Sequence, residues 1–293
     1  MHTPLISGLD SWQRKEFELA AGAFRLQLGK RTRIMGVLNL TPNSFSNDGI
    51  YKDPQRAKEA VFKMVEQGAD IIDIGGQSTR PGAQSISVDE ELARVLPVIR
   101  EISKKFKIPL SIDTTKSEVA HAALAEGASV VNDISGLKFD PQMADVITRF
   151  GAGCILMHIK GTPQTMQQNP YYASLIEEII VSLKDSVSKA CAAGIEKKKI
   201  VVDPGIGFGK TTEHNLEIIK RLKEFSSLNL PILIGTSRKS LIGNVLNVAV
   251  EKRLMGTAAT VAAAIFNGAH IIRVHDVGEM VQVARMVDAI LTI

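Results

Sequence analysis

Short apolar, β-branched runs alternate along the chain with longer stretches whose apolar residues recur at helical spacing. The runs that predict strands are 33–39, 70–75, 109–114, 129–134, 154–159, 199–204, 231–236 and 270–275. The stretches that predict helices are 54–68, 88–106, 117–127, 141–151, 174–194, 214–225, 253–268 and 277–291. Several helices are expected to end in a left-handed glycine, at 68, 127, 151, 194 and 268.

A regular strand–helix alternation over about 260 residues predicts an α/β fold, a (β/α)8 TIM barrel. The alternative is a doubly wound open sheet, but the Gly-x-Gly-x-x-Gly turn that such sheets often carry after the first strand is absent. We expect one domain over 1–293, with the barrel proper at about 33–293. Before it, residues 23–36 alternate around Gly29 and Lys30 and predict an N-terminal β-hairpin turning there.

The bulk composition narrows the possible partners. The chain is 45% hydrophobic, and its net charge is only +4, with no basic stripe of interleaved aromatic residues, which argues against nucleic acid. The run 197–199 of three lysines is expected to face solvent. The N-terminus lacks an apolar signal core and no apolar run approaches 18 residues, so we expect a cytoplasmic protein without a membrane partner. Cys154 and Cys191 are expected to be reduced thiols.

Polar side chains gather where the predicted strands end. They are Asn39, Asp73, Asp113, Asn132, Asp133, His158, Asp203, Ser237, Arg238, Lys239, Arg273 and His275. Active sites of (β/α)8 barrels lie where the strands end and the following loops begin. The pattern therefore predicts a functional site at this mouth of the barrel.

Each of these residues alone also has a purely structural interpretation. Asp113 or Asp203 could cap the helix that follows it. His158 is more readily a satisfied core histidine than a functional one, and Arg273 could simply pair with a barrel carboxylate. What favours a site is the convergence of carboxylates and amides from several strands on one mouth.

The residue types suggest the chemistry of a ligand. Two acids and an amide in an apolar pocket suit a flat heterocycle with an aminopyrimidinone edge, because a carboxylate can accept two parallel hydrogen bonds. Arg80, Lys239, Arg273 and His275 suit an anion such as a phosphate group. A diphosphate would also require Mg²⁺, which needs few protein ligands.

Eight segments together resemble the dihydropteroate synthase family. They are MGVLNLTPNSFSNDG (35–49), DIGGQSTRPGA (73–83), SIDT (111–114), VNDISG (131–136), LMHIKGTPQTMQ (156–167), DPGIGFGKTTEHNLEI (203–218), GTSRKSLIG (235–243) and GAHIIRVHDV (268–277). The resemblance implies a (β/α)8 transferase of folate biosynthesis that joins a pterin diphosphate to 4-aminobenzoate and releases pyrophosphate. It also implies a sulfonamide target and a homodimer formed through the later helices.

The resemblance implies roles residue by residue. Asn39 matches the residue that binds Mg²⁺ and the diphosphate, while Arg273 and His275 match the pair at the ring face and the diphosphate. The expected pterin-binding residues are Asp113, Asn132, Asp203 and Lys239, with Met157 and Phe208 as walls. Thr79, Arg80 and Pro81 match a mobile loop, and Ser240 matches the residue near the aminobenzoate carboxylate. Asp113, Arg80 and Lys239 are expected to act in catalysis.

Two departures from the family pattern stand out. In the first loop Asn43 replaces an acid and Asp48 follows Asn47, with one glycine retained, and Lys160 stands where the family commonly has Gln. Two rivals remain: a pterin-dependent methyltransferase, which resembles this fold and shares the Asp/Asn/Asp pocket, and a non-catalytic pterin-binding paralogue, which the first-loop departures leave open. Pyrophosphate release that depends on 4-aminobenzoate would distinguish a synthase from both.

Overall fold

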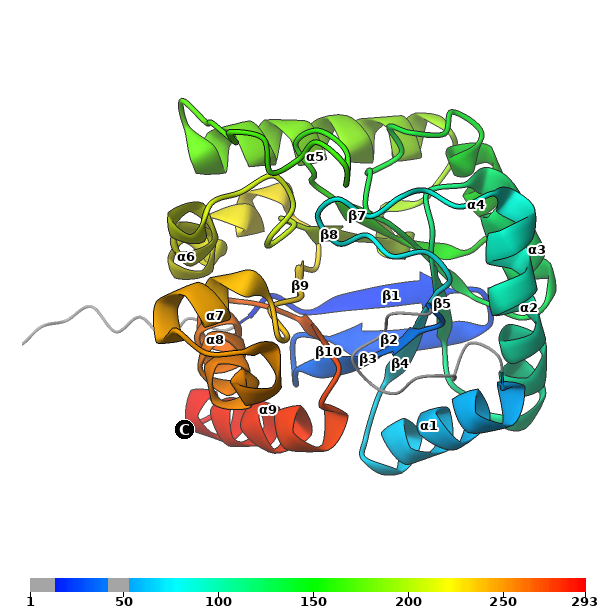
Figure 1. Ribbon diagram of the computed structural model, residues 1–293, viewed down its shortest axis with the longest axis horizontal. Helices are drawn as coiled ribbons and strands as arrows, with labels where there is room; N and C mark the ends of the chain where they lie inside the picture. The colour runs from blue at the N-terminus through cyan, green and yellow to red at the C-terminus, as the bar shows by residue number, and fades with distance from the viewer. Residues whose placement is uncertain (1–13, 42–52) are drawn as a thin grey trace, which may run out of the picture.

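A computed structural model describes residues 14–41 and 53–293. Its main sheet has eight parallel strands in the order β8-β7-β6-β5-β4-β3-β10-β9, and a bridge between Val202 and Ile232 joins the two edges, which closes the barrel seen in Figure 1. The barrel strands are β3 (Arg33–Asn39), β4 (Ile71–Gly75), β5 (Leu110–Asp113), β6 (Val130–Asp133), β7 (Gly153–Met157), β8 (Ile200–Asp203), β9 (Leu233–Ile234) and β10 (Ile271–Val274). The predicted (β/α)8 barrel is confirmed.

The N-terminal hairpin is present, but its predicted position is wrong. It consists of β1 (Phe17–Ala21) and β2 (Phe24–Leu28), which pair antiparallel around Gly22. Gly29 instead leads from β2 towards β3, and there a Cβ would lie 2.7 Å from the carbonyl oxygen of Lys15. The hairpin turns earlier because Leu19, Ala21 and Leu28 pack with apolar side chains from the barrel strands and cover that end of the barrel.

Helices surround the sheet, as Figure 1 shows. They are α1 (Pro54–Glu66), α2 (Val88–Lys105), α3 (Ser117–Ala125), α4 (Met143–Phe150), α5 (Leu175–Ala192), α6 (Thr212–Lys220), α7 (Ser240–Leu246), α8 (Leu254–Phe266) and α9 (Val277–Leu291). All five glycines predicted to terminate helices have positive φ, between 60° and 112°. The main departures are the short extra helix α7 after β9 and a 3₁₀ segment, Leu222–Leu228, which replaces the end of the helix predicted over 214–225.

The strands are buried on both faces, as parallel strands covered by helices should be. One apolar cluster fills the layer between strands and helices, from Ile34 to Val287 along the chain. Cys154 lies in this layer, Cys191 packs against it, and both are free thiols. Within the part of the chain that the structure describes, none of the helices has the length and apolar character that a membrane crossing requires.

Candidate active site

A cavity of about 400 Å³ opens at the mouth formed by the carboxyl ends of the strands, within the usual size range of small-molecule sites. Register places these ends at one level, since Gly75 pairs with Asp113, Asp113 with Asn132 and Met157 with Asp203. The predicted site residues that line the cavity are Asn39, Thr79, Arg80, Pro81, Asp113, Phe208, Lys239, Ser240, Arg273 and His275. The structure thus brings ten of the predicted residues to one space.

Arg273 is held between two carboxylates on the cavity floor. Its Nε donates to Asp73 Oδ2 at 2.6 Å, and its Nη2 donates to Asp113 Oδ2 at 2.7 Å. Burial raises the pKa of Asp113 to about 7, although the charge of Arg273 opposes the shift. The second oxygens of both carboxylates are buried and have no hydrogen-bond partner among the described residues. Arg273 therefore does pair with barrel carboxylates, and each of the two carboxylates keeps one oxygen without a partner in the described part of the chain.

Asn132, Met157 and Asp203 are buried residues of the neighbouring strands rather than part of the cavity lining. Asn132 donates its amide to Asp73 Oδ2 at 3.1 Å. Asp203 accepts from the backbone N–H of Gly205 at 2.7 Å, and burial raises its pKa, while the charge of Lys239 opposes this. Met157 packs in a small apolar cluster against Phe208, which does line the cavity.

Lys239 spans the loops that follow β8 and β9. Its ammonium donates to the carbonyl of Ile206 and lies 4.9 Å from the centre of the Phe208 ring, a cation–π arrangement. Burial lowers the pKa of Lys239 to about 8, and the nearby charge of Asp203 opposes the shift. An ammonium beside a carboxylate and an aromatic ring can bind the edge of a polar heterocycle.

His275 lies in a positively charged part of the mouth. Burial, followed by the charges of Arg273, Arg238 and Arg80, lowers its pKa to about 4, so the imidazole is neutral at pH 7. Its Nδ1 is 3.0 Å from Ser237 Oγ, and its Nε2 is 3.5 Å from Asn39 Nδ2. This concentration of cations and neutral donors suits a phosphate or diphosphate.

The loop between β9 and α7 adopts an unusual backbone conformation. Arg238 has φ of +56°, a conformation that non-glycine residues rarely adopt. Its N–H donates to Thr257 Oγ1, its guanidinium forms two hydrogen bonds with Asp276, and its carbonyl accepts from Arg253 Nη1. These contacts hold the turn that presents Lys239 and the exposed Ser240 at the first residue of α7.

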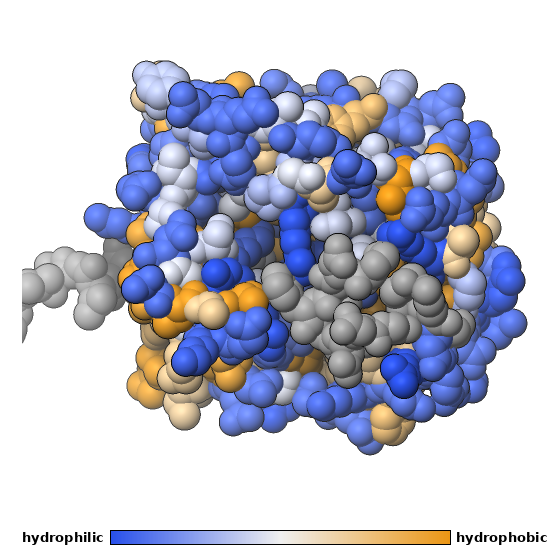
Figure 2. Space-filling view, in the orientation of Figure 1, coloured by the Kyte–Doolittle hydropathy of each residue, from blue (hydrophilic) through white to orange (hydrophobic). Residues whose placement is uncertain are grey.

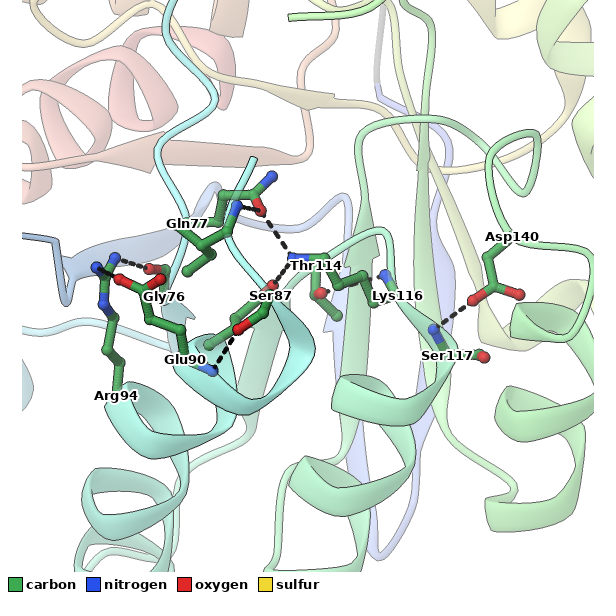
Figure 3. Close-up of polar contacts among 11 residues, drawn as sticks. Gly76, Gln77, Ser87, Glu90, Arg94, Thr114, Lys116, Ser117 and Asp140 are labelled. Carbon is green, nitrogen blue, oxygen red and sulfur yellow. Dashed lines mark hydrogen bonds and ion pairs between the residues drawn. The ribbon is translucent and has the colours of Figure 1, made fainter. Parts of the chain in front are cut away.

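The loop after β4 crosses towards the loop after β7. Thr79, Arg80 and Pro81 line the cavity, and the N–H of Gly82 donates to the carbonyl of Pro163 at 3.0 Å. Burial lowers the pKa of Arg80. The base of this loop is held by polar contacts of Gly76 and Gln77, which Figure 3 shows.

The structure also shows the surroundings of two residues, His158 and Lys160, that the sequence singled out away from the predicted substrate contacts. His158 is buried, as its core interpretation predicted, with Nδ1 2.9 Å from the buried Lys210 ammonium. Lys160 is exposed on the loop after β7, and its ammonium lies 4.1 Å from the Tyr172 ring centre. The departures at Asn43, Asn47 and Asp48 lie outside the described residues.

The contacts of three residues that organise the site were not predicted from the sequence, although Asp73 was among the polar residues at the strand ends. Asp73 was identifiable as a lone carboxylate inside the apolar run IIDIG, yet it was assigned no contact with Arg273 or Asn132. Lys210 donates to the carbonyl of Phe208 and so fixes the wall of the cavity. Arg253 lines the cavity from the start of α8, and no strand end pointed to it.

Comparison with known proteins gives one consistent result. Residues 35–275 match the model of the pterin binding enzyme family. The dihydropteroate synthase of Synechocystis sp. is 46% identical over 273 residues, which cover 93% of this chain and 94% of the relative.

Two solved structures extend this likeness to the fold. The Yersinia pestis dihydropteroate synthase, solved in a sulfonamide drug complex, has a TM-score of 0.90 at 40% identity, with 94% of this chain and 100% of that chain covered. The Clostridium difficile enzyme, solved in the presence of pteroic acid, has a TM-score of 0.84 at 48% identity, with 90% and 98% covered. The chain belongs to the dihydropteroate synthase family of pterin-binding enzymes.

Proposed function

We propose that this transferase condenses 6-hydroxymethyl-7,8-dihydropterin diphosphate with 4-aminobenzoate, forming 7,8-dihydropteroate and pyrophosphate. The observation that carries the proposal is that a carboxylate floor, a cationic rim and the loop after β4 converge on one cavity. Relatives solved with pteroic acid and with a sulfonamide drug support it.

The pterin would lie on the floor of the cavity. Asp203 would accept from the amino-pyrimidinone edge, with Asn132 beside it and Lys239 donating to the ring. Phe208, which lines the cavity, would form an apolar wall, with Met157 in the buried cluster behind it. Asp203 and Asp113 are buried, so an unpaired charge there is costly and a ligand that supplies donors is favoured.

Bond cleavage would separate charge within this pocket. When the bond from the methylene carbon to the diphosphate oxygen breaks, the electron pair leaves with pyrophosphate and positive charge develops on the pterin. Asp113 would stabilise that cation, whereas Arg273 and neutral His275 would stabilise the leaving group. The amine of 4-aminobenzoate then bonds to the carbon and loses a proton. An arylamine is already a competent nucleophile, so no strong general base is required.

Mg²⁺ is proposed to accompany the diphosphate. Among residues 14–41 and 53–293 there is no group of three or more His, Cys, Asp or Glu side chains that could hold a metal ion. Asn39 offers one neutral oxygen at the mouth, which fits an ion that keeps waters and takes its remaining ligands from substrate phosphates. When bound, the ion would offset negative charge on the leaving group. EDTA should therefore abolish turnover while leaving the non-phosphorylated pterin bound, and activity after full chelation would contradict the proposal.

The second substrate would enter under the loop after β4. Arg80 and Pro81 would flank the ring of 4-aminobenzoate, and Ser240 would lie near its carboxylate. Sulfonamides, which resemble 4-aminobenzoate, would occupy the same place.

A homodimer through the later helices is also proposed. Figure 2 shows hydrophobic residues gathered at the lower left, where Figure 1 places α7, α8 and α9. Exposed apolar side chains of these three helices include Val245, Leu246, Met255, Phe266, Met286 and Ile290. Such a patch favours burial against a second copy of the chain.

We also propose a cytoplasmic location for the protein, as the sequence predicts.

The proposed reaction is tested by incubating the protein with both substrates and Mg²⁺ and identifying dihydropteroate by mass spectrometry. Formation of the product supports the proposal. A protein that binds the pterin but yields no product under these conditions would be the non-catalytic paralogue instead.

A further inference from the structure

The loop after β4 has a base and a tip that are held by different contacts. At the base, Arg94 Nη1 donates to the carbonyl of Gly76 at 2.8 Å, and the N–H of Ile86 donates to Gln77 Oε1 at 3.1 Å. The second bond joins the two ends of the loop. At the tip, a Cβ on Gly82 would meet nothing within 4 Å, and its N–H makes the bond to Pro163. The contacts of the base therefore set where the loop leaves β4 and where it rejoins the chain before α2.

Lys116 connects this base to the helix that follows the loop. Its ammonium donates to Gln77 Oε1 at 2.7 Å and to Glu91 Oε2, on α2, at 2.6 Å. Figure 3 shows Lys116 reaching Gln77 from the turn before α3. Glu91 is only 1% exposed, and its Oε1 has no hydrogen-bond partner in the described part of the chain. A buried carboxylate needs its counter-ion, so Lys116 is held in place and Gln77 with it.

The turn that carries Lys116 also carries a residue of the cavity floor. Asp113 ends β5, and the N–H of Lys116 donates to the buried Thr114 Oγ1 at 3.2 Å. On the other side, the N–H of Ser117 donates to Asp140 Oδ2 at 2.7 Å, as Figure 3 also shows. One short, well-held segment therefore sets both the floor at Asp113 and the base of the loop that lies over the cavity.

We propose that Lys116 is a positioning residue for the second substrate: through Gln77 it fixes the base of the loop so that Thr79, Arg80 and Pro81 lie where 4-aminobenzoate binds. Lys116 touches neither substrate in this account. The inference rests on the proposed function where it is tested through the KM for 4-aminobenzoate. Its test by hydrogen exchange in the loop does not depend on that function.

The test uses the double variant Lys116→Met/Glu91→Gln, because Lys116→Met alone would leave a buried carboxylate unpaired and could prevent folding. Amide hydrogen exchange in residues 77–87 should become faster. The KM for 4-aminobenzoate should rise at least about tenfold, while the Kd for the non-phosphorylated pterin stays within about twofold. Lys116→Arg keeps a charged donor and should retain much of the wild-type KM.

Arg100→Met is the matched control. The Arg100–Glu126 pair also joins α2 to the end of α3, but it involves no residue of the loop, so exchange in 77–87 and the KM should not change. Unchanged exchange and KM in the double variant would overturn the inference, as would the same losses in Arg100→Met. If the wild-type protein forms no product, the proposed function fails, and the exchange measurement still decides the role of Lys116.

Discussion

Asp203 is the residue on which the proposed recognition of the pterin depends most directly. Asp203→Asn keeps the shape and one acceptor oxygen, but it turns the other acceptor into a donor that faces the donor edge of the ring. Leaving a buried polar group unpaired costs about 1–3 kcal/mol. Binding of the non-phosphorylated pterin should weaken at least about tenfold, or about 1.4 kcal/mol, measured by calorimetry. Unchanged affinity in the folded variant would remove Asp203 from the site.

The shifted pKa values of Asp113 and Lys239 together predict a pH optimum for the reaction. Burial raises the pKa of Asp113 to about 7, so the carboxylate that stabilises the pterin cation forms as the pH rises through that value. Burial lowers the pKa of Lys239 to about 8, so its ammonium is lost above that value. The kcat/KM for the pterin diphosphate should therefore be bell-shaped, with limbs near these two values. A profile flat from about pH 5.5 to about pH 9.5 would contradict both assignments.

At the scale of elements, the loop after β4 predicts an order of binding. Arg80 lines the cavity and lies close enough to His275 to affect its pKa, so it faces the region proposed for the diphosphate. We expect 4-aminobenzoate to bind measurably only when pterin and pyrophosphate already fill the pocket. Arg80→Ala should lower turnover about 10²-fold yet leave binding of the non-phosphorylated pterin within about twofold. Normal turnover in Arg80→Ala, or equal affinity of the empty enzyme for 4-aminobenzoate, would refute this order.

The sequence predicted the elements better than it predicted their contacts. Strand and helix periodicity located the eight barrel strands, and the polar residues at the strand ends indicated the correct mouth of the barrel. The hairpin turn was misplaced because alternation around Gly29 continues from β2 into β3, so only tertiary packing shows which glycine turns the chain. Likewise, no local pattern shows that Asp73 binds Arg273, 200 residues away. Long-range pairs of this kind are decided by the closure of the barrel.

At the scale of the whole molecule, the exposed apolar patch predicts assembly. Met286 on α9 is 65% exposed, so Met286→Glu should leave the fold intact but place a charge in the proposed interface. Sedimentation should show a dimer for the wild-type protein and mostly monomer for the variant. Val181→Glu is the matched control, because Val181 is 57% exposed on α5, away from α7–α9 in Figure 1. A monomeric wild-type protein, or dissociation by both variants, would contradict this interface.

The central claim is that one cavity binds a pterin diphosphate and transfers the pterin to an arylamine. The most direct measurement is pyrophosphate release from 6-hydroxymethyl-7,8-dihydropterin diphosphate, in the presence of Mg²⁺, with and without 4-aminobenzoate. The account predicts sustained release that requires 4-aminobenzoate and saturates with its concentration. It would be contradicted by a protein that binds the pterin and releases no pyrophosphate, or by steady release that is the same whether or not 4-aminobenzoate is present.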